Sequence, residues 1–152
     1  MEKHYGHLVR ILHWCTHQVI SQSLESLELT SAQGRIMGYL AHCPEPPCPR
    51  DIEQAFQLSH PTVSGLLSRL EQKGFVRLYT DPEDRRCKRI QVLPRGIQIQ
   101  KEMHQAITAN ETQMVAGFTE EECAIFRSLL QRAIANMGGC THPHESKEEP
   151  HS

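Results

Sequence analysis

Basic side chains gather in one short stretch of this chain, "TDPEDRRCKRIQV", which runs from Thr80 to Val92. It holds four closely spaced cations: Arg85, Arg86, Lys88 and Arg89. Apolar and polar residues alternate over 75–79, and Asp-Pro favours a turn. We therefore predict strands over 75–79 and about 88–92, with a charged loop over about 80–88. Because guanidinium and ammonium groups bind phosphate oxygens, this hairpin is a candidate nucleic-acid contact.

The charge of the whole chain does not by itself favour such a contact. The 152 residues have a formal net charge of −2. Residues 69–101, however, contain nine Lys or Arg against four Asp or Glu, a local charge of +5 that leaves −7 for the rest. A basic segment within an acidic chain is expected when one face meets phosphate and the other faces do not.

The segment ahead of the hairpin, "RDIEQAFQLSHPTVSGLLSRLEQKGF" (50–75), contains the signals of two short helices. We predict the first over 51–57. The second, about 59–73, starts with Ser59 as N-cap and Pro61 in its first turn, and it stops at Gly74. Its apolar residues recur at helical spacing and predict one buried face: Val63, Leu66, Leu67 and Leu70. Two helices joined by a short turn and followed by a hairpin form a winged helix-turn-helix.

Exposed polar side chains on the second helix and the wing are the expected DNA contacts. A helix of this kind enters the major groove, and the wing lies beside the backbone or in the adjacent minor groove. The predicted contacts are Ser59, His60, Thr62, Ser64, Ser68 and Arg69 on the helix and Arg85, Arg86 and Lys88 on the wing. We expect Asp84 to hold the Arg86 guanidinium through a charge-assisted hydrogen bond.

Amphipathic helices are predicted on both sides of this lobe, so the fold class is mainly α with a small β-hairpin wing. One helix covers His4 to Leu24. Thr30 and Gln33 form a capping box for the next, and Thr119 and Glu122 form another for the last. A long helix is expected over 94–116. The first and last helices have more apolar surface than one small domain can cover, so we expect them to pack against a second copy of the chain.

The predicted organisation has four parts. Residues 1–28 form an N-terminal dimerisation helix, and 29–93 form the winged-helix lobe. Residues 94–138 form C-terminal dimerisation helices, and 139–152 form a polar tail that we expect to be disordered.

Three stretches carry a resemblance to a known family: "LTSAQ", "LSHPTVSGLLSRLEQKGFV" and "DPEDRRCKRIQVLPRG". From about Leu29 to Gly96 the chain resembles the MarR-type winged-helix regulators of bacteria and archaea. One departure is Leu93, which replaces the family's usual threonine before Pro94. The change removes a side-chain cap worth about 1 kcal/mol from the long helix but leaves the wing chemistry intact.

The resemblance implies a homodimeric transcriptional regulator, most often a repressor. Such dimers bind double-stranded DNA at inverted repeats whose half-sites lie one helical turn apart, about 10 base pairs. By the same resemblance, Arg86 is the minor-groove residue. Family members release DNA on binding an aromatic or amphipathic small molecule, on thiol oxidation, or with a metal.

Each kind of release has candidate residues here. A small-molecule effector is expected at the junction of the dimer helices and the DNA-binding lobe, near His13, Trp14, His17, Met37, Tyr39, Met103 and His104. The redox candidate is Cys87, because the flanking cations stabilise a thiolate. Cys15 is expected to be a core residue. His13 and His17 share a helical face, but the two close ligand pairs of a tetrahedral zinc site are missing, so we expect no metal and no cofactor. The alternative to release by a small molecule is a thiol-based redox or metal-responsive regulator of the same fold.

Other functional classes fit the sequence less well. The motifs of phosphate loops, zinc hydrolases and serine hydrolases are absent, so we expect no enzyme activity. A winged helix that binds only protein is an alternative, but it has no need of a concentrated positive charge. The chain lacks both an apolar run long enough to span a membrane and a signal peptide, so we expect a cytoplasmic protein whose six cysteines are thiols.

Overall fold

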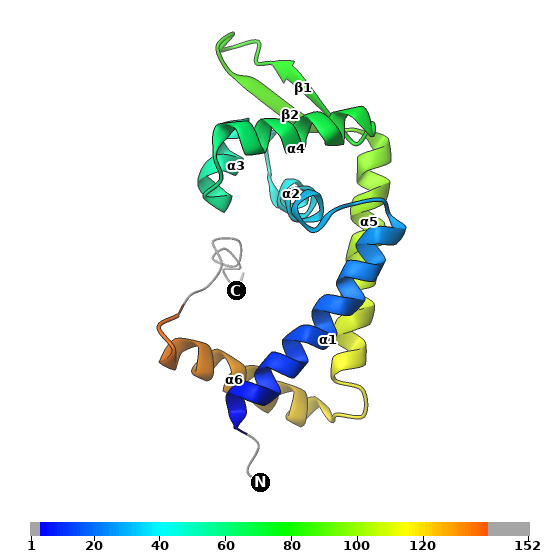
Figure 1. The fold of residues 1–152 in the computed structure, drawn as a ribbon, viewed down its shortest axis with the longest axis vertical. Coiled ribbons are helices and arrows are strands. Elements are labelled where there is room, and N and C mark those ends of the chain that lie inside the picture. The colour runs from blue at the N-terminus through cyan, green and yellow to red at the C-terminus, as the bar shows by residue number, and fades with distance from the viewer. Residues whose placement is uncertain (1–3, 140–152) are drawn as a thin grey trace. The chain divides into compact units, whose positions relative to one another are not determined.

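The computed structural model of the chain describes residues 4–139, so most of the tail predicted to be disordered lies outside the described residues. The order of elements is α1 (Tyr5–Ser26), α2 (Ser31–His42), α3 (Pro49–Phe56), α4 (His60–Gln72), β1 (Val76–Thr80), β2 (Lys88–Val92), α5 (Pro94–Met114) and α6 (Glu120–Asn136) (Figure 1). The structure therefore confirms a mainly α fold with one β-hairpin. None of the described helices is long and apolar enough to cross a membrane.

The chain forms two compact units, one up to Glu111 and one from Thr112 onward. The first unit contains α1 to α4, the hairpin and most of α5. The second contains the end of α5 and α6. The predicted capping boxes are both present, Thr30 with Gln33 on α2 and Thr119 with Glu122 on α6.

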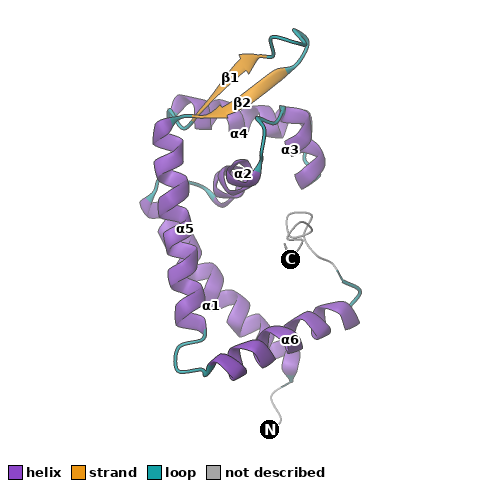
Figure 2. Cartoon of the chain, turned by 180° about the vertical axis from the view of Figure 1, so that it is seen from behind, coloured by secondary structure: helices purple, strands orange, loops and turns teal. Residues whose placement is uncertain are grey.

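The hairpin continues directly from the end of α4 (Figure 2). Gly74 adopts φ +76, which ends α4, and the amide of Phe75 donates back to the carbonyl of Leu70 at 3.0 Å. Because Phe75 still closes the helix, β1 begins one residue later than predicted. The strands are antiparallel, with Val76 opposite Val92 and Thr80 opposite Lys88.

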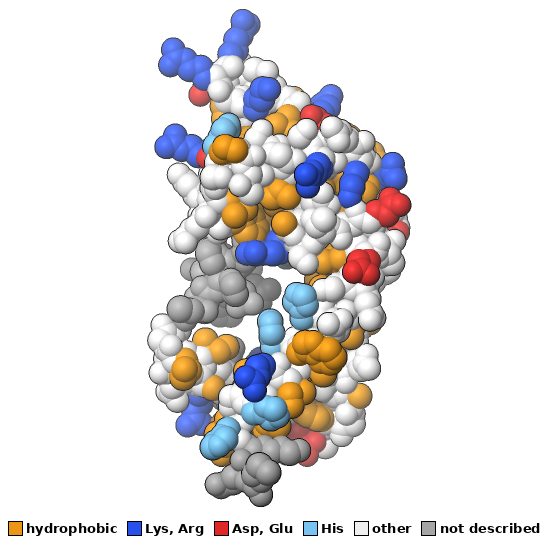
Figure 3. Space-filling model, in the orientation of Figure 1, with side chains coloured by type: hydrophobic (Ala, Val, Ile, Leu, Met, Phe, Trp, Pro, Cys, Tyr) orange, Lys and Arg blue, Asp and Glu red, His pale blue; other side chains and the backbone are white. Residues whose placement is uncertain are grey.

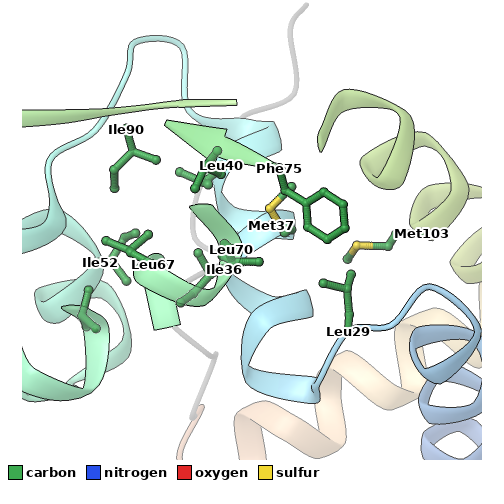
Figure 4. Packing of buried hydrophobic residues seen from close by; sticks show 12 residues of the cluster. Leu29, Ile36, Met37, Leu40, Ile52, Leu67, Leu70, Phe75, Ile90 and Met103 are labelled. Atoms are coloured by element: carbon green, nitrogen blue, oxygen red, sulfur yellow. The ribbon is translucent and has the colours of Figure 1, made fainter. Parts of the chain in front are cut away.

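A single hydrophobic core holds the winged-helix elements together (Figure 4). The face of α4 predicted to be buried supplies Val63, Leu67 and Leu70, and Leu66 packs at its margin. The other buried hydrophobic residues come from neighbouring elements: Leu29, Ile36, Met37, Leu40, Ile52, Phe75, Val76, Ile90 and Met103. Since this core immobilises one face of α4, the opposite face is presented to solvent in a defined orientation.

A lysine at the end of α4 ties this helix to the α1–α2 turn. The Lys73 ammonium group donates to the backbone carbonyl of Glu28 and, at 3.1 Å, to the side-chain oxygen of Gln33. Gln33 is buried and belongs to the capping box of α2. The C-terminal end of α4 is therefore held at a fixed position relative to α2.

Candidate nucleic-acid interface

The wing presents three cations without ion-pair partners. Arg85, Arg86 and Lys88 are exposed, and none of them pairs with a carboxylate among residues 4–139. Lys and Arg side chains gather over this end of the lobe in the space-filling view (Figure 3). Unpaired cations on a projecting loop can bind phosphate without first breaking an internal interaction.

The fourth cation has a structural role. Arg89 Nε lies 3.0 Å from Asp81 Oδ2 across the hairpin, and Arg89 Nη1 donates to the carbonyl of Pro46 at 3.2 Å. The backbone N–H of Glu83 and then the Arg89 guanidinium lower the pKa of the Asp81 carboxyl. Arg89 thus anchors the wing to the segment between α2 and α3. Sequence reasoning counted Arg89 among the basic residues but missed this pairing.

The prediction that Asp84 holds the Arg86 guanidinium is wrong. Asp84 Oδ1 instead accepts the backbone N–H of Arg86 at 3.1 Å, which tightens the turn. The backbone N–H of Cys87 also donates to the carbonyl of Asp84, at 3.0 Å. Because Asp84 is occupied by the backbone, the Arg86 side chain extends from an ordered turn with its guanidinium available to a ligand.

The predicted recognition residues divide into two groups. Ser59 caps α4, accepting the backbone N–H of Thr62 at 3.4 Å, and the two hydroxyls are 2.8 Å apart. His60 Nδ1 lies 2.5 Å from Glu53 Oε1 on α3. These three exposed residues therefore position the start of α4 through bonds within the protein.

The second group faces solvent. Ser64, Ser68 and Arg69 are exposed on the face of α4 opposite the core. Ser64 and Ser68 make no side-chain hydrogen bond to the part of the chain that the structure describes. Arg69 lies in the last turn of α4, and the N-cap at Ser59 marks the other end. This helix face and the wing cations belong to one lobe.

A separate apolar cavity of about 330 Å³ lies between α1, α2 and α5 within the first unit. Its lining residues are His17, Ile20, Ser21, Ser23, Leu24, Leu27, Ser31, Gly34, Arg35, Gly38, Met103, Ala106 and Ile107. Only His17 and Met103 belong to the predicted effector set. The small residues Gly34, Gly38 and Ala106 at facing helix positions are the sequence signal that could have located the cavity.

The other five residues proposed for the effector site do not line this cavity. Met37 is fully buried in the core. Tyr39 packs edge-to-face on Phe56 of α3. The remaining three are exposed on α1 and α5: His13, Trp14 and His104.

The thiols and histidines also differ in part from expectation. Cys15 is exposed and not a core residue, because α1 has no buried residue within the described chain. Cys87 is half-buried. The rings of His13 and His17 lie 6.0 Å apart, but no group of three metal-binding side chains occurs among the described residues.

Comparisons with known proteins agree with this geometry. The MarR family model matches residues 27–86. The HTH-type transcriptional regulator YwaE of Bacillus subtilis is 31% identical over 88 residues. The match covers 58% of this chain and 52% of that protein, so the chain spans about half the length of this curated relative.

Two solved structures of one regulator cover almost the whole fold. MepR, a transcription regulator of the Staphylococcus aureus multidrug efflux pump MepA, is 30% identical with a TM-score of 0.79, covering 89% of this chain and 99% of that one. A MepR mutant bound to an oligodeoxyribonucleotide is 32% identical with a TM-score of 0.71, covering 90% and 99%. By this sequence match and these structural similarities, the chain belongs to the MarR family of transcriptional regulators.

Proposed function

We propose that the chain is a homodimeric repressor that binds an inverted-repeat DNA operator and releases it when a small apolar or amphipathic molecule enters the α1–α2–α5 cavity. The observation that carries the DNA-binding part is the lobe that combines three unpaired wing cations with the exposed serine face of α4. The wing supplies charge for the backbone or minor groove, and α4 supplies short polar groups for the major groove.

Similarity to a DNA-bound relative supports the same proposal. The MepR mutant that was solved with an oligodeoxyribonucleotide matches nearly the full length of this chain. Membership of a family of transcriptional regulators also agrees with the expectation that the chain has no enzyme activity.

Exposed apolar residues support the dimer. Neither α1 nor α6 has a buried residue among those described, although both have large hydrophobic side chains on their surface. These are Tyr5, Leu8, Val9, Ile11, Trp14 and Val19 on α1 and Ile125, Leu129 and Ile134 on α6. Apolar area of this extent marks a protein–protein interface, and a second copy of the chain provides a self-complementary partner.

The cavity supports release by a ligand. Its volume of about 330 Å³ lies at the lower end of the range for small-molecule sites, and most of its lining is apolar. Arg35 lines the cavity, and its guanidinium lies 5.0 Å from the ring centroid of Phe56 on α3. A ligand that displaces Arg35 would therefore disturb the first helix of the helix-turn-helix.

The test of DNA binding compares three fluorescent duplexes: the inverted repeat nearest the protein's own gene, a half-site and a scrambled sequence. We expect nanomolar affinity for the inverted repeat, at least a hundredfold preference over the scrambled duplex, and a stoichiometry of two chains per site. The logarithm of the affinity should fall linearly as the logarithm of the salt concentration rises. Equal, salt-insensitive binding to all three duplexes would instead favour a module that binds protein partners.

The test of the cavity fills it with a side chain. Ala106 lines the cavity, and Ala109 is an exposed residue of α5 outside it. We expect Ala106→Phe to retain DNA binding within about threefold, and to lose both the thermal shift and the DNA release caused by any ligand found in a screen of aromatic and amphipathic compounds. Ala109→Phe should keep both responses. A ligand that still releases the Ala106→Phe variant would place the effector site elsewhere.

A further inference from the structure

The histidine at the start of α4 is held by a carboxylate from the preceding helix. His60 Nδ1 lies 2.5 Å from Glu53 Oε1 on α3. The His60 side chain is 77% exposed, whereas that of Glu53 is only 20% exposed. The backbone carbonyl of Glu53 also accepts the amide of Leu58 at 3.1 Å, so this residue is fixed at the turn between the two helices. An exposed ring on the surface that we propose for DNA is therefore held from within the protein.

The carboxylate determines which nitrogen of the ring faces outward. An ionised carboxylate only accepts hydrogen bonds, so Nδ1 carries a hydrogen whether the imidazole is neutral or charged. Nε2 is on the opposite side of the ring and makes no hydrogen bond to the part of the chain that the structure describes. It accepts a hydrogen bond when the ring is neutral and donates one when the ring is protonated. Nε2 is thus the ring atom that can bind DNA.

No second acidic group competes for this ring. The first turn of α4 has no acidic residue, and no other carboxylate of the described chain lies within ion-pair distance of His60. The other charged residues of α3 are Arg50, one turn before Glu53, and Asp51, whose carboxylate is bonded to the amide and the thiol of Cys48. Glu53 is consequently the group that orients His60.

We propose that His60 reads a guanine in each operator half-site through Nε2, with Glu53 as its positioning residue. The first residues of a recognition helix reach base edges in the major groove. Guanine presents two acceptors there, N7 and O6, and no donor. The negative potential of DNA favours a protonated ring, which donates to these acceptors. This assignment rests on the proposed function, because it requires α4 to enter the major groove of an operator.

Base-pair substitution in the operator tests the assignment. Each position of a half-site is replaced in turn by the other base pairs, and fluorescence anisotropy measures binding of the native chain and of His60→Ala. We expect one G·C pair per half-site whose replacement weakens native binding roughly fivefold to a hundredfold, but weakens binding of His60→Ala less than about twofold. Other positions should respond equally in both proteins. If His60→Ala keeps the native discrimination at every position, His60 reads no base and the proposal is overturned.

The dependence of binding on pH tests the donor role of Nε2. A ring that is protonated in the complex couples DNA binding to proton uptake, so operator affinity should fall as the pH is raised from about 6 to about 8. His60→Ala should lose that part of the dependence. His104→Ala removes an exposed imidazole from α5 and should keep it. If His60 makes no contribution to the pH dependence, or contributes an affinity that rises with pH, the ring does not donate to guanine.

Nitrogen NMR of the DNA-free chain tests the Glu53 contact separately from DNA binding. In the native protein the neutral His60 ring should carry its proton on Nδ1, and in Glu53→Ala it should carry it on Nε2, the commoner tautomer. Signals of the other histidines should not change, which controls for folding. The same tautomer in both proteins would overturn the positioning role. If the native chain binds no operator, the proposed function fails, while the tautomer still decides whether Glu53 orients the ring.

Discussion

Replacing Arg86 with alanine will weaken operator binding by about tenfold to a hundredfold at physiological salt, the range expected for one arginine that contacts DNA directly. Arg86 is exposed, forms no ion pair within residues 4–139, and extends from a turn ordered by the Asp84 carboxylate. The backbone of Arg86 is therefore ordered while its guanidinium has no ion-pair partner within the described residues, so its loss removes a DNA contact without releasing an internal partner. Fluorescence anisotropy with the inverted-repeat duplex measures the effect.

A matched variant separates this contact from simple loss of charge. Arg127→Ala removes the same charge from an exposed position on α6 and should change operator affinity by less than about twofold. For the Arg86 variant, the slope of the logarithm of the affinity against the logarithm of the salt concentration should also be smaller by about one. Equal effects of the two substitutions would mean that the wing contributes only net charge.

Replacing Gly96 with alanine will destabilise the fold by about 3 kcal/mol, at the upper end of the usual range for overpacking. A Cβ at this position would overlap the carbonyl oxygen of Phe75 and lie 2.8 Å from Val92 Cγ1. That carbonyl cannot easily move away, because it accepts the amide of Leu93 at 2.9 Å. Gly96 thus allows α5 to start directly against the end of the hairpin.

Thermal unfolding measures the loss. For a chain of this size a change of 3 kcal/mol lowers the midpoint by roughly 6–12 °C. Gly65→Ala is the control, since nothing lies within 4 Å of a Cβ at that helical position. It should stabilise α4 by roughly 0.5–1 kcal/mol, because glycine disfavours helix interiors. If the Gly96→Ala chain has the same midpoint of thermal unfolding as the native protein, the α5–hairpin junction relaxes freely around the added Cβ.

Local signals were sufficient to predict the elements of this fold. Several helix ends are formed by residues that lie within a few positions of one another. These are the capping box of Thr30 and Gln33, the N-cap Ser59, the terminating Gly74, and the capping box of Thr119 and Glu122. Such interactions depend on spacing along the chain, so they can be recognised without knowing what lies nearby in space. The buried face of α4 was predictable for the same reason, because a period of 3.6 residues identifies one side of a helix.

The chemistry of the wing was predictable in composition but not in its internal pairing. The four cations were evident from residue types alone. Which of them would be neutralised depended on the hairpin register, which places Tyr79 opposite Arg89 and brings Asp81 to its guanidinium. The nearer carboxylate in sequence, Asp84, is occupied by a backbone N–H that only the turn geometry brings to it.

The cavity was decided by tertiary structure. Helical periodicity shows that a face is apolar, but it does not show whether that face meets the core, a cavity or another subunit. Five of the seven proposed effector residues therefore lie away from the cavity, and Cys15 is exposed instead of buried. The packing of the wing against the segment before α3, where the amide of Ile90 donates to the carbonyl of Pro47, is likewise a long-range contact that no local pattern encodes.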